Sequence, residues 1–423
     1  MSKAQIVFEA PFLSRSGYGD HARDLLKSLI DIGSYDIKIV TTSWGDCPND
    51  RYPELDSYQL QDSNIKPNVY IKLGIPNEFQ KKAPYSIGIT AGIETTLCPA
   101  EWVEGCNRMD LVIVPSQHSR DTFLNTIFDK MDNNTKQKIG EVKCEKPIEV
   151  LFEGVDTNHF YKLEKSKNTD VDKLIDKIPE DFCFLFAGHW IQGDHGHDRK
   201  DVGATIETFI ETFRNTGKSK RPALILKTSG ATFSTVQYND IYKRIRNITD
   251  KYRVEIPNIY VIEGSFSTDE MNALYNHKKV KAMVSFTHGE GYGRPLAEFC
   301  ITQKPVIASN WSGQKDFLTH SVKLPGSMKE VHHSAANNMI LKESKWFYVD
   351  YGYASKIMKD VFKNYKNYIP DARKQARLIR EDFNLNEMTN KFKTILDANL
   401  PKFAKKIKLN IPKLEKVYNF YNS

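Results

Sequence analysis

One continuous stretch, residues 284–317 of this 423-residue chain, constrains the fold more than any other; it reads VSFTHGEGYGRPLAEFCITQKPVIASNWSGQKDF. The apolar run at 280–286 predicts a buried strand, and three alternate glycines at 289–293 then predict a loop whose backbone N–H groups are open to a ligand. Pro295 suits the first turn of a helix, and apolar residues at helical spacing follow it. A strand, a glycine-rich loop and a helix N-terminus together favour the binding of an anion.

Two acidic residues of this stretch are candidates for binding side chains. Glu290 lies in the predicted loop and Glu298 in the first helical turn, with seven residues between them. The next apolar run, 305–308, predicts the following parallel strand, and ligands of parallel sheets bind at the carboxyl ends of such strands. We therefore expect both carboxylates to face one crevice and to bind hydroxyl groups there. The alternative is a surface acid pair that only caps the helix.

Short apolar runs alternate with segments of helical spacing along most of the chain. Strands are predicted at 5–8, 37–41, 69–71, 87–90, 111–114, 147–152, 183–187, 223–227 and 259–262, and helices at 21–32, 202–213, 268–276, 354–365, 371–383 and 388–396. Beyond residue 346 only helices are expected. The alternation is typical of α/β domains with doubly wound parallel sheets, and at about 150 residues per domain the length fits two large ones.

The composition supports a globular chain, because 40% hydrophobic and 11% aromatic residues are enough for real cores. No apolar run reaches about 18 residues and no signal-peptide pattern precedes the first strand, so we expect a soluble, cytoplasmic protein without a transmembrane segment. The net charge of +7 lies partly in the segment 401–416 and indicates either a solvated helix face or an anionic partner. Six scattered cysteines are expected to be reduced thiols: Cys47, Cys98, Cys106, Cys144, Cys183 and Cys300.

The motif GEGYGRPLAEF, followed by KPVIASNWSG, resembles the nucleotide-sugar signature of retaining glycosyltransferases of family 4, also called group 1. The resemblance implies the GT-B fold: two Rossmann-like, doubly wound α/β domains facing across a cleft, with C-terminal helices that cross back to the first domain. On this basis we predict an acceptor-side domain at 1–160, a nucleotide-sugar-binding domain at 161–370, and returning helices at 371–423. The charged segment 162–180 supports the first boundary.

The same resemblance implies a hexosyl- or pentosyltransferase that moves a sugar from a nucleotide-diphosphate sugar, a UDP- or GDP-sugar, to a hydroxyl acceptor on a glycan, lipid or small molecule. No cofactor or catalytic metal is implied. Glu290 would contact hydroxyls of the transferred sugar, and Glu298 would hold the nucleotide ribose. The loop around Gly291 would bind the donor, with main-chain amides of Tyr292, Gly293 and Arg294 against the sugar and diphosphate.

A second loop, residues 188–200, reads GHWIQGDHGHDRK and carries adjacent cations. The resemblance implies an arginine and a lysine here that clamp the donor diphosphate, where negative charge builds as the glycosidic bond breaks. Lys200 matches the lysine. His189 occupies the usual place of the arginine, so we assign that role to Arg199. An exposed basic pair ahead of a helix is the alternative.

The histidines of this second loop raise the question of a metal site. Five residues with metal-binding side chains are close in sequence on a glycine-bearing loop: His189, Asp194, His195, His197 and Asp198. The loop lacks the second fixed ligand pair that a structural zinc site shows. We therefore predict no metal there.

The first domain offers two weaker candidates. The loop at 9–20 contains Gly17 and Gly19, where the family presents a glycine loop to the donor phosphates; a plain turn is the alternative. Many relatives carry a histidine near the motif ITAGIETTLCPAEW, and this chain has Glu94 instead. Glu94 is therefore a candidate for an acceptor-side contact, or else a structural acid paired with a neighbour.

After the strand at 259–262, Ser265 lies where relatives place the nucleotide base. Ser267 with Glu270 predicts a capping box for the next helix. Lys227 is interpreted as the solvated end of a strand.

Two other functions stay open. The net charge of +7 favours a DNA-modifying glycosyltransferase that acts on a hydroxylated base, with nucleic acid as acceptor. The other is a non-catalytic GT-B protein that binds nucleotide sugars, against which the intact set Glu290, Glu298 and Lys200 argues.

Overall fold

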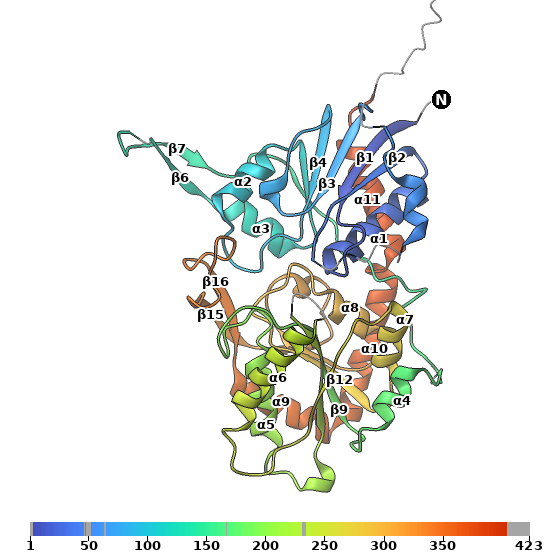
Figure 1. The fold of residues 1–423 in the computed structure, drawn as a ribbon, viewed down its shortest axis with the longest axis vertical. Helices are drawn as coiled ribbons and strands as arrows, with labels where there is room; N and C mark the ends of the chain where they lie inside the picture. Colours follow the sequence, from blue (N-terminus) through green and yellow to red (C-terminus); the bar gives the residue numbers. More distant parts are fainter. Residues whose placement is uncertain are drawn as a thin grey trace, which may run out of the picture.

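The computed structural model describes residues 3–45, 47, 52–62, 65–132, 134–165, 167–230 and 234–403 (Figure 1). Most of the basic segment predicted at 401–416, and the end of the helical segment predicted at 371–423, lie outside the described residues. The described chain forms two six-stranded sheets and two small hairpins. All pairs in both large sheets are parallel, which confirms the predicted two-domain α/β architecture.

The first sheet has the strand order β2-β1-β3-β4-β5-β8. Its strands are β1 (Ala4–Ala10), β2 (Tyr35–Thr41), β3 (Val69–Leu73), β4 (Tyr85–Ile89), β5 (Leu111–Val114) and β8 (Ile148–Val150). Side chains of β1 alternate between two cores: Ile6 and Phe8 pack with Leu25 of α1 (Gly17–Ile32), whereas Val7 packs with Trp102 of α2 (Ala100–Asn107). Both faces of the sheet are therefore covered, as a parallel sheet requires.

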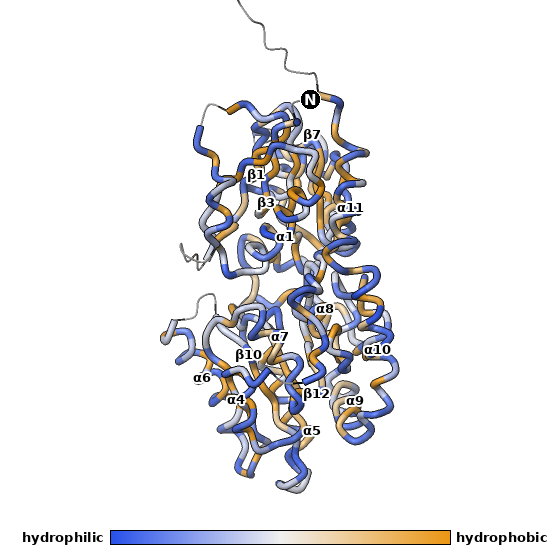
Figure 2. The backbone as a smooth tube through the Cα atoms, turned by 90° about the vertical axis from the view of Figure 1, so that its right-hand side faces the viewer, coloured by the Kyte–Doolittle hydropathy of each residue, from blue (hydrophilic) through white to orange (hydrophobic). Residues whose placement is uncertain are grey.

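The second sheet has the order β11-β10-β9-β12-β13-β14. Its strands are β9 (Cys183–His189), β10 (Ala223–Ser229), β11 (Ile259–Ile262), β12 (Val280–Ser285), β13 (Val306–Ser309) and β14 (Val322–Leu324). One face is covered by α5 (Val202–Phe213), α6 (Thr235–Thr249) and α9 (Tyr351–Lys363), and the other by α4 (Asp170–Asp176), α7 (Thr268–Asn276) and α8 (Arg294–Cys300). Figure 2 shows hydrophobic residues concentrated along the strands between these layers.

Two chain segments cross between the domains side by side. After β8, the backbone N–H of Val155 donates to the carbonyl of Phe383 at 2.9 Å, and that of Leu385 donates to the carbonyl of Val155 at 2.9 Å. This crossing separates α10 (Tyr365–Asp382), on the second domain, from α11 (Leu385–Asn399), which packs on α1 (Figure 1). A Cβ on Gly154 would lie 2.6 Å from the Cα of Leu385, so the crossing needs a glycine there. The boundaries predicted at 160 and 370 stay predictions.

Helix caps explain where the sequence-based bounds were wrong. α1 begins at Gly17 rather than 21, because the Ser16 hydroxyl accepts the N–H of Gly19 and caps the helix earlier.

The predicted helix-only region after 346 in fact contains β16 (Lys345–Val349), paired antiparallel with β15 (Gly326–Glu330). The capping box of Ser267 and Glu270 is confirmed.

Several elements were not predicted from the sequence. They are α2, α4, α6, β14, β15, β16, α3 (Gln117–Asn125) and the hairpin of β6 (Phe128–Met131) and β7 (Lys138–Val142). None of the helices in the described part of the chain combines the length and apolar character needed to cross a membrane.

We expect replacement of Phe392→Ala to destabilise the protein, because its fully buried ring fixes α11 in the core cluster that also contains Leu25 and Leu29 of α1. Loss of a buried aromatic ring costs about 3–5 kcal/mol. Denaturant-induced unfolding measures this change. The control, Lys393→Ala, removes an exposed i,i+4 ion pair with Asp397 and should cost no more than about 0.5 kcal/mol. Equal effects of the two substitutions would contradict the docking of α11.

Candidate active site

The candidate site lies at the carboxyl ends of the second sheet, where they face the first domain. The loop after β9 carries Arg199 and Lys200, and the loop after β12 carries Glu290. The two loops are bonded to each other, since the backbone N–H of His288 donates to the carbonyl of Arg199 at 2.8 Å. From the first domain, the loop after β4 brings Glu94. Figures 1 and 2 both place α1 and α8 at the level where the domains meet.

Four predicted side chains come together there in one ionic network. Lys200 Nζ lies 2.5 Å from Glu290 Oε1, and Arg199 Nη1 lies 3.1 Å from Glu290 Oε2. The same Arg199 nitrogen lies 3.2 Å from Glu94 Oε1, so the network joins the two domains. Arg199 and Lys200 are largely buried, and the alternative of an exposed basic pair is therefore wrong.

Burial and charge act in opposite directions within this network, which we call the clamp network. Burial alone raises the pKa of Glu290, but the charges of Lys200 and Arg199 outweigh it and bring that pKa below its usual value. Burial lowers the pKa of Lys200, and Glu290 opposes that effect. The network has two cations and two carboxylates, so its formal charge is balanced. An anion at Arg199 and Lys200 would therefore compete with Glu290 for both cations and with Glu94 for Arg199.

A second buried network, which we call the Arg294 cluster, surrounds the start of α8. Arg294 Nε lies 2.9 Å from Glu298 Oε1, and its Nη1 lies 2.7 Å from Asp24 Oδ2 and 3.9 Å from Glu153 Oε2. Asp24 belongs to α1 of the first domain. The sequence pointed only to the main-chain amide of Arg294; its side chain is a second bridge between the domains, which no local pattern reveals.

The Arg294 cluster is rich in acid. Burial raises the pKa of Glu298 to about 7 and that of Glu153 to about 7, although Arg294 opposes both shifts. Burial also raises the pKa of Asp24. One guanidinium cannot balance three ionised carboxylates in a buried place, and Glu298 and Glu153 therefore titrate near neutral pH.

The glycines of the loop after β12 are required by the approach of the first domain. A Cβ on Gly291 would lie 2.5 Å from the carbonyl oxygen of Ala91, and one on Gly289 would lie 2.2 Å from that of Glu94. The Gly291 carbonyl accepts a hydrogen bond from the Ser116 hydroxyl at 2.6 Å. The sequence predicted that these glycines leave backbone N–H groups open to a ligand; their close packing on the first domain was not predicted.

The next residues of the loop set the start of α8. Gly293 is the N-cap and has φ 104°, a conformation that favours glycine. The Tyr292 ring is buried against Phe317, with ring centroids 4.8 Å apart. The side chain of Tyr292 is thus part of the core, and only its backbone is available for the predicted role.

Gly17 and Gly19 lie in the first turn of α1, not in the predicted loop. Gly19 packs tightly, because a Cβ there would lie 2.1 Å from the carbonyl oxygen of Ser14. A Cβ on Gly17 would have no described atom within 4 Å. A side chain would therefore find space at Gly17 but not at Gly19.

The loop after β11 holds Ser265, which is half-buried. Close by, Lys227 donates to the Gly264 carbonyl at 2.5 Å, and its ammonium lies 4.6 Å from the centroid of the Phe266 ring. The side chain is buried, which lowers the pKa of Lys227 to about 8. The interpretation of Lys227 as a solvated strand end was wrong, because the residue lies in a central strand whose end is covered by this loop.

No protein-family model matches the sequence, and no curated protein matches it. Solved structures match its fold. Sucrose-phosphate synthase from Thermosynechococcus elongatus aligns with a TM-score of 0.62 and 12% identity over 94% of this chain and 99% of that chain. The HepE protein of Anabaena in complex with UDP-glucose aligns with a TM-score of 0.54 and 12% identity over 93% and 99%.

A UDP-forming trehalose-phosphate synthase from Burkholderia xenovorans, in complex with glucose-6-phosphate, aligns with a TM-score of 0.57 and 10% identity over 93% of this chain and 100% of that chain. These alignments each span both domains. The chain therefore has the GT-B fold of these glycosyltransferases, as the resemblance implied.

We expect the substitution Arg294→Met to be strongly destabilising, by about 3–5 kcal/mol, because it removes the cation from a buried acidic cluster. The loss should be larger at pH 8 than at pH 5. Glu298 and Glu153 have folded pKa values of about 7, above the usual 4.5, so the folded protein retains their protons at pH 5 and loses them at pH 8.

Denaturant unfolding at the two pH values measures the effect. The control Arg377→Met removes an exposed i,i+4 pair with Glu381 and should cost less than about 1 kcal/mol at either pH. A loss for Arg294→Met that does not change with pH would show that the carboxylates around it do not titrate in this range.

Proposed function

We propose that the protein is a retaining glycosyltransferase that moves a sugar from a nucleotide-diphosphate sugar to a hydroxyl group of an acceptor. The observation that carries the proposal is the clamp network: Arg199, Lys200 and Glu290 meet at the carboxyl ends of β9 and β12, facing Glu94 of the first domain. This is where ligands of doubly wound sheets bind. The matched structures with UDP-glucose and with glucose-6-phosphate support a sugar nucleotide as donor and favour UDP.

In the proposed donor complex the two cations change partners. The diphosphate takes the place of Glu290 beside Lys200 and Arg199, and Glu290 is released to accept hydrogen bonds from sugar hydroxyls. Glu298 binds the ribose hydroxyls, and Ser265 lies near the base. Gly17 and Gly19 of α1 lie on the opposite side of the donor. The sugar and diphosphate face the backbone of four consecutive residues: Gly291, Tyr292, Gly293 and Arg294. The proposed binding needs no cofactor.

In the proposed reaction, the bond between the anomeric carbon and the diphosphate oxygen breaks, and the electron pair leaves with the diphosphate. The acceptor oxygen bonds to the anomeric carbon on the same face, and its proton passes to the departing phosphate oxygen. Lys200 and Arg199 stabilise the charge that develops on the leaving group. Glu94 lies on the acceptor side of this arrangement, and we propose that it orients the acceptor hydroxyl.

A thermal-shift panel of UDP-, GDP-, ADP- and CDP-sugars tests donor binding. A ligand at about 100 times its Kd stabilises the folded state by about 2.7 kcal/mol, and we expect this shift with UDP-glucose or another UDP-sugar. Lys200→Ala and Glu298→Ala should abolish it. Lys374→Ala, at an exposed position on α10, is the matched control and should retain it. The proposed donor site would be contradicted if the shift in melting temperature persisted in both site variants, or if no sugar nucleotide shifted the melting temperature of the wild type.

The anomeric configuration of the product tests the retaining course separately. With an α-linked donor we expect an α-linked product in proton NMR, because attack and departure occur on one face. A β-linked product would contradict retention and leave glycosyl transfer intact. Binding of the donor without turnover over a panel of hydroxyl acceptors would instead favour a non-catalytic binding protein.

A further inference from the structure

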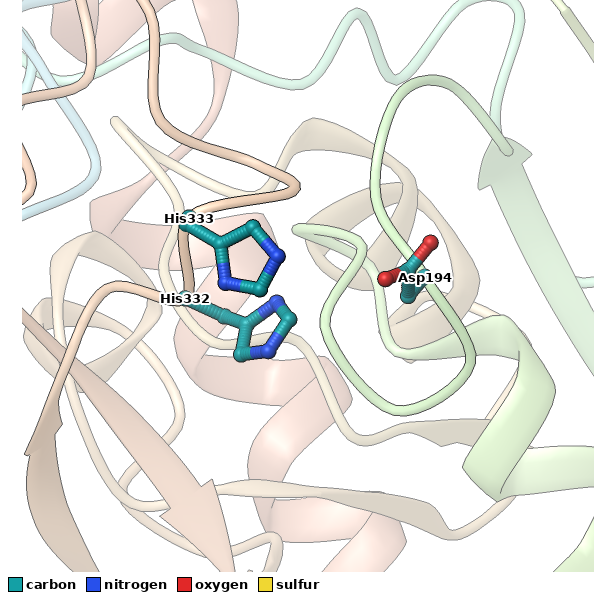
Figure 3. A group of neighbouring side chains, drawn as sticks. All are labelled: Asp194, His332 and His333. Atoms are coloured by element: carbon teal, nitrogen blue, oxygen red, sulfur yellow. The ribbon is translucent and has the colours of Figure 1, made fainter.

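Three side chains with metal-binding atoms meet on the second domain, from segments far apart in the sequence. Asp194 lies in the loop between β9 and α5, and His332 and His333 lie in the connection between β15 and β16. One ligand atom of each residue lies within 4.8 Å of those of the other two. Figure 3 shows the two imidazoles side by side, with the carboxylate across the gap between the two segments.

Hydrogen bonds position two of these residues, Asp194 through its backbone and His332 through its ring, independently of any ion. The Ser334 hydroxyl accepts the backbone N–H of Asp194 at 3.0 Å and lies 2.8 Å from His332 Nδ1. His332 Nδ1 also accepts the backbone N–H of Ser334 at 3.3 Å. A metal bound at Nε2 therefore needs the other tautomer, in which Nδ1–H donates to the Ser334 hydroxyl as an outer-shell partner. The Ser334 carbonyl also accepts the Gln192 side-chain amide at 3.2 Å and so joins the same two segments.

A stacked ring also holds the ring of His332 in place. His197 stacks on it with ring centroids 3.9 Å apart and an interplanar angle of 7°, and His197 Nδ1 lies 3.1 Å from the Tyr348 hydroxyl. His195, in the same loop, is engaged elsewhere, because its Nε2 lies 2.9 Å from Glu207 Oε2. His195 therefore belongs to the same loop as Asp194 but not to the group of Asp194, His332 and His333, and it serves as a control position.

We propose that Asp194, His332 and His333 bind one divalent transition-metal ion, with zinc as the best fit. Two imidazoles and one carboxylate form a known zinc ligand set, which leaves a fourth position for water. Imidazole nitrogen suits zinc, copper and nickel, whereas magnesium and calcium take oxygen ligands. His333 and Asp194 are exposed and His332 is half-buried, so the ion reaches the site from solvent without crossing the core.

The proposed ion would link two segments of the second domain. It ties the β9–α5 loop, which further along carries Arg199 and Lys200, to the connection between β15 and β16. Asp194 and Ser334 also line a cavity of about 560 Å³ together with Trp190 and Arg244. The ion would therefore stabilise the conformation of one wall of this cavity and of the loop that leads to the clamp network.

Calorimetric titration of zinc chloride into EDTA-treated, dialysed protein tests the site, with melting temperature as a second readout. We expect saturable binding of one zinc ion per chain, a rise in melting temperature, and no comparable binding of magnesium. His333→Ala and Asp194→Asn should each weaken zinc binding at least tenfold, and Ser334→Ala about 10-fold to 100-fold through the outer shell. His195→Ala should bind zinc like the wild type.

Two results would overturn the proposal. The first is the absence of stoichiometric zinc binding to the wild type. The second is equal zinc affinity of the wild type, His333→Ala and Asp194→Asn, which would mean adventitious binding to surface histidines. His333 and Asp194 are exposed, so circular dichroism should show both variants folded like the wild type. Lys200→Ala, which removes a residue of the clamp network, should leave zinc binding unchanged, and this separates the metal site from the proposed glycosyl transfer.

Discussion

The loop after β12 is packed between two domains, and the rest of the site depends on this contact. Gly289 and Gly291 approach the backbone of Glu94 and Ala91 so closely that a Cβ at either position would clash. The carbonyl of Gly291 also accepts the Ser116 hydroxyl. Because the loop packs on the first domain and continues into α8 of the second, the backbone at Glu290 and Arg294 is positioned against both domains.

Two ionic networks of different charge balance lie along this contact. The clamp network has equal numbers of cations and carboxylates, whereas the Arg294 cluster places three carboxylates around one guanidinium. Both networks join the domains, through Glu94 in the first and Asp24 in the second. An anionic ligand that binds to Arg199 and Lys200 would change the net charge of the clamp network. Uptake or loss of protons by the carboxyl groups of the Arg294 cluster would change the net charge beside α8. An anion bound to Arg199 and Lys200 would therefore change the ionic contacts that join the two domains.

Local sequence patterns predicted most strands of the two large sheets and the motifs at their ends. Alternating apolar runs and helical periods placed most strands of both parallel sheets, because these patterns reflect burial on the two faces of a strand and one face of a helix. The motif around Glu290 and Glu298, the pair Arg199 and Lys200, and the capping box at Ser267 were all visible as short contiguous patterns. Each of these signals depends on residues within a few positions of one another.

Residues that are distant in sequence and share a site were found only in the folded chain. Arg294 contacts Asp24 and Glu153, and Asp194 lies beside His332 and His333, although these residues are far apart in sequence and belong to no common motif. The loop at 188–200 contains only one of these three side chains, so its sequence does not reveal the two histidines that another segment supplies. Burial of Lys227 was likewise hidden, because desolvation depends on what the folded chain places over a side chain and not on its neighbours in sequence.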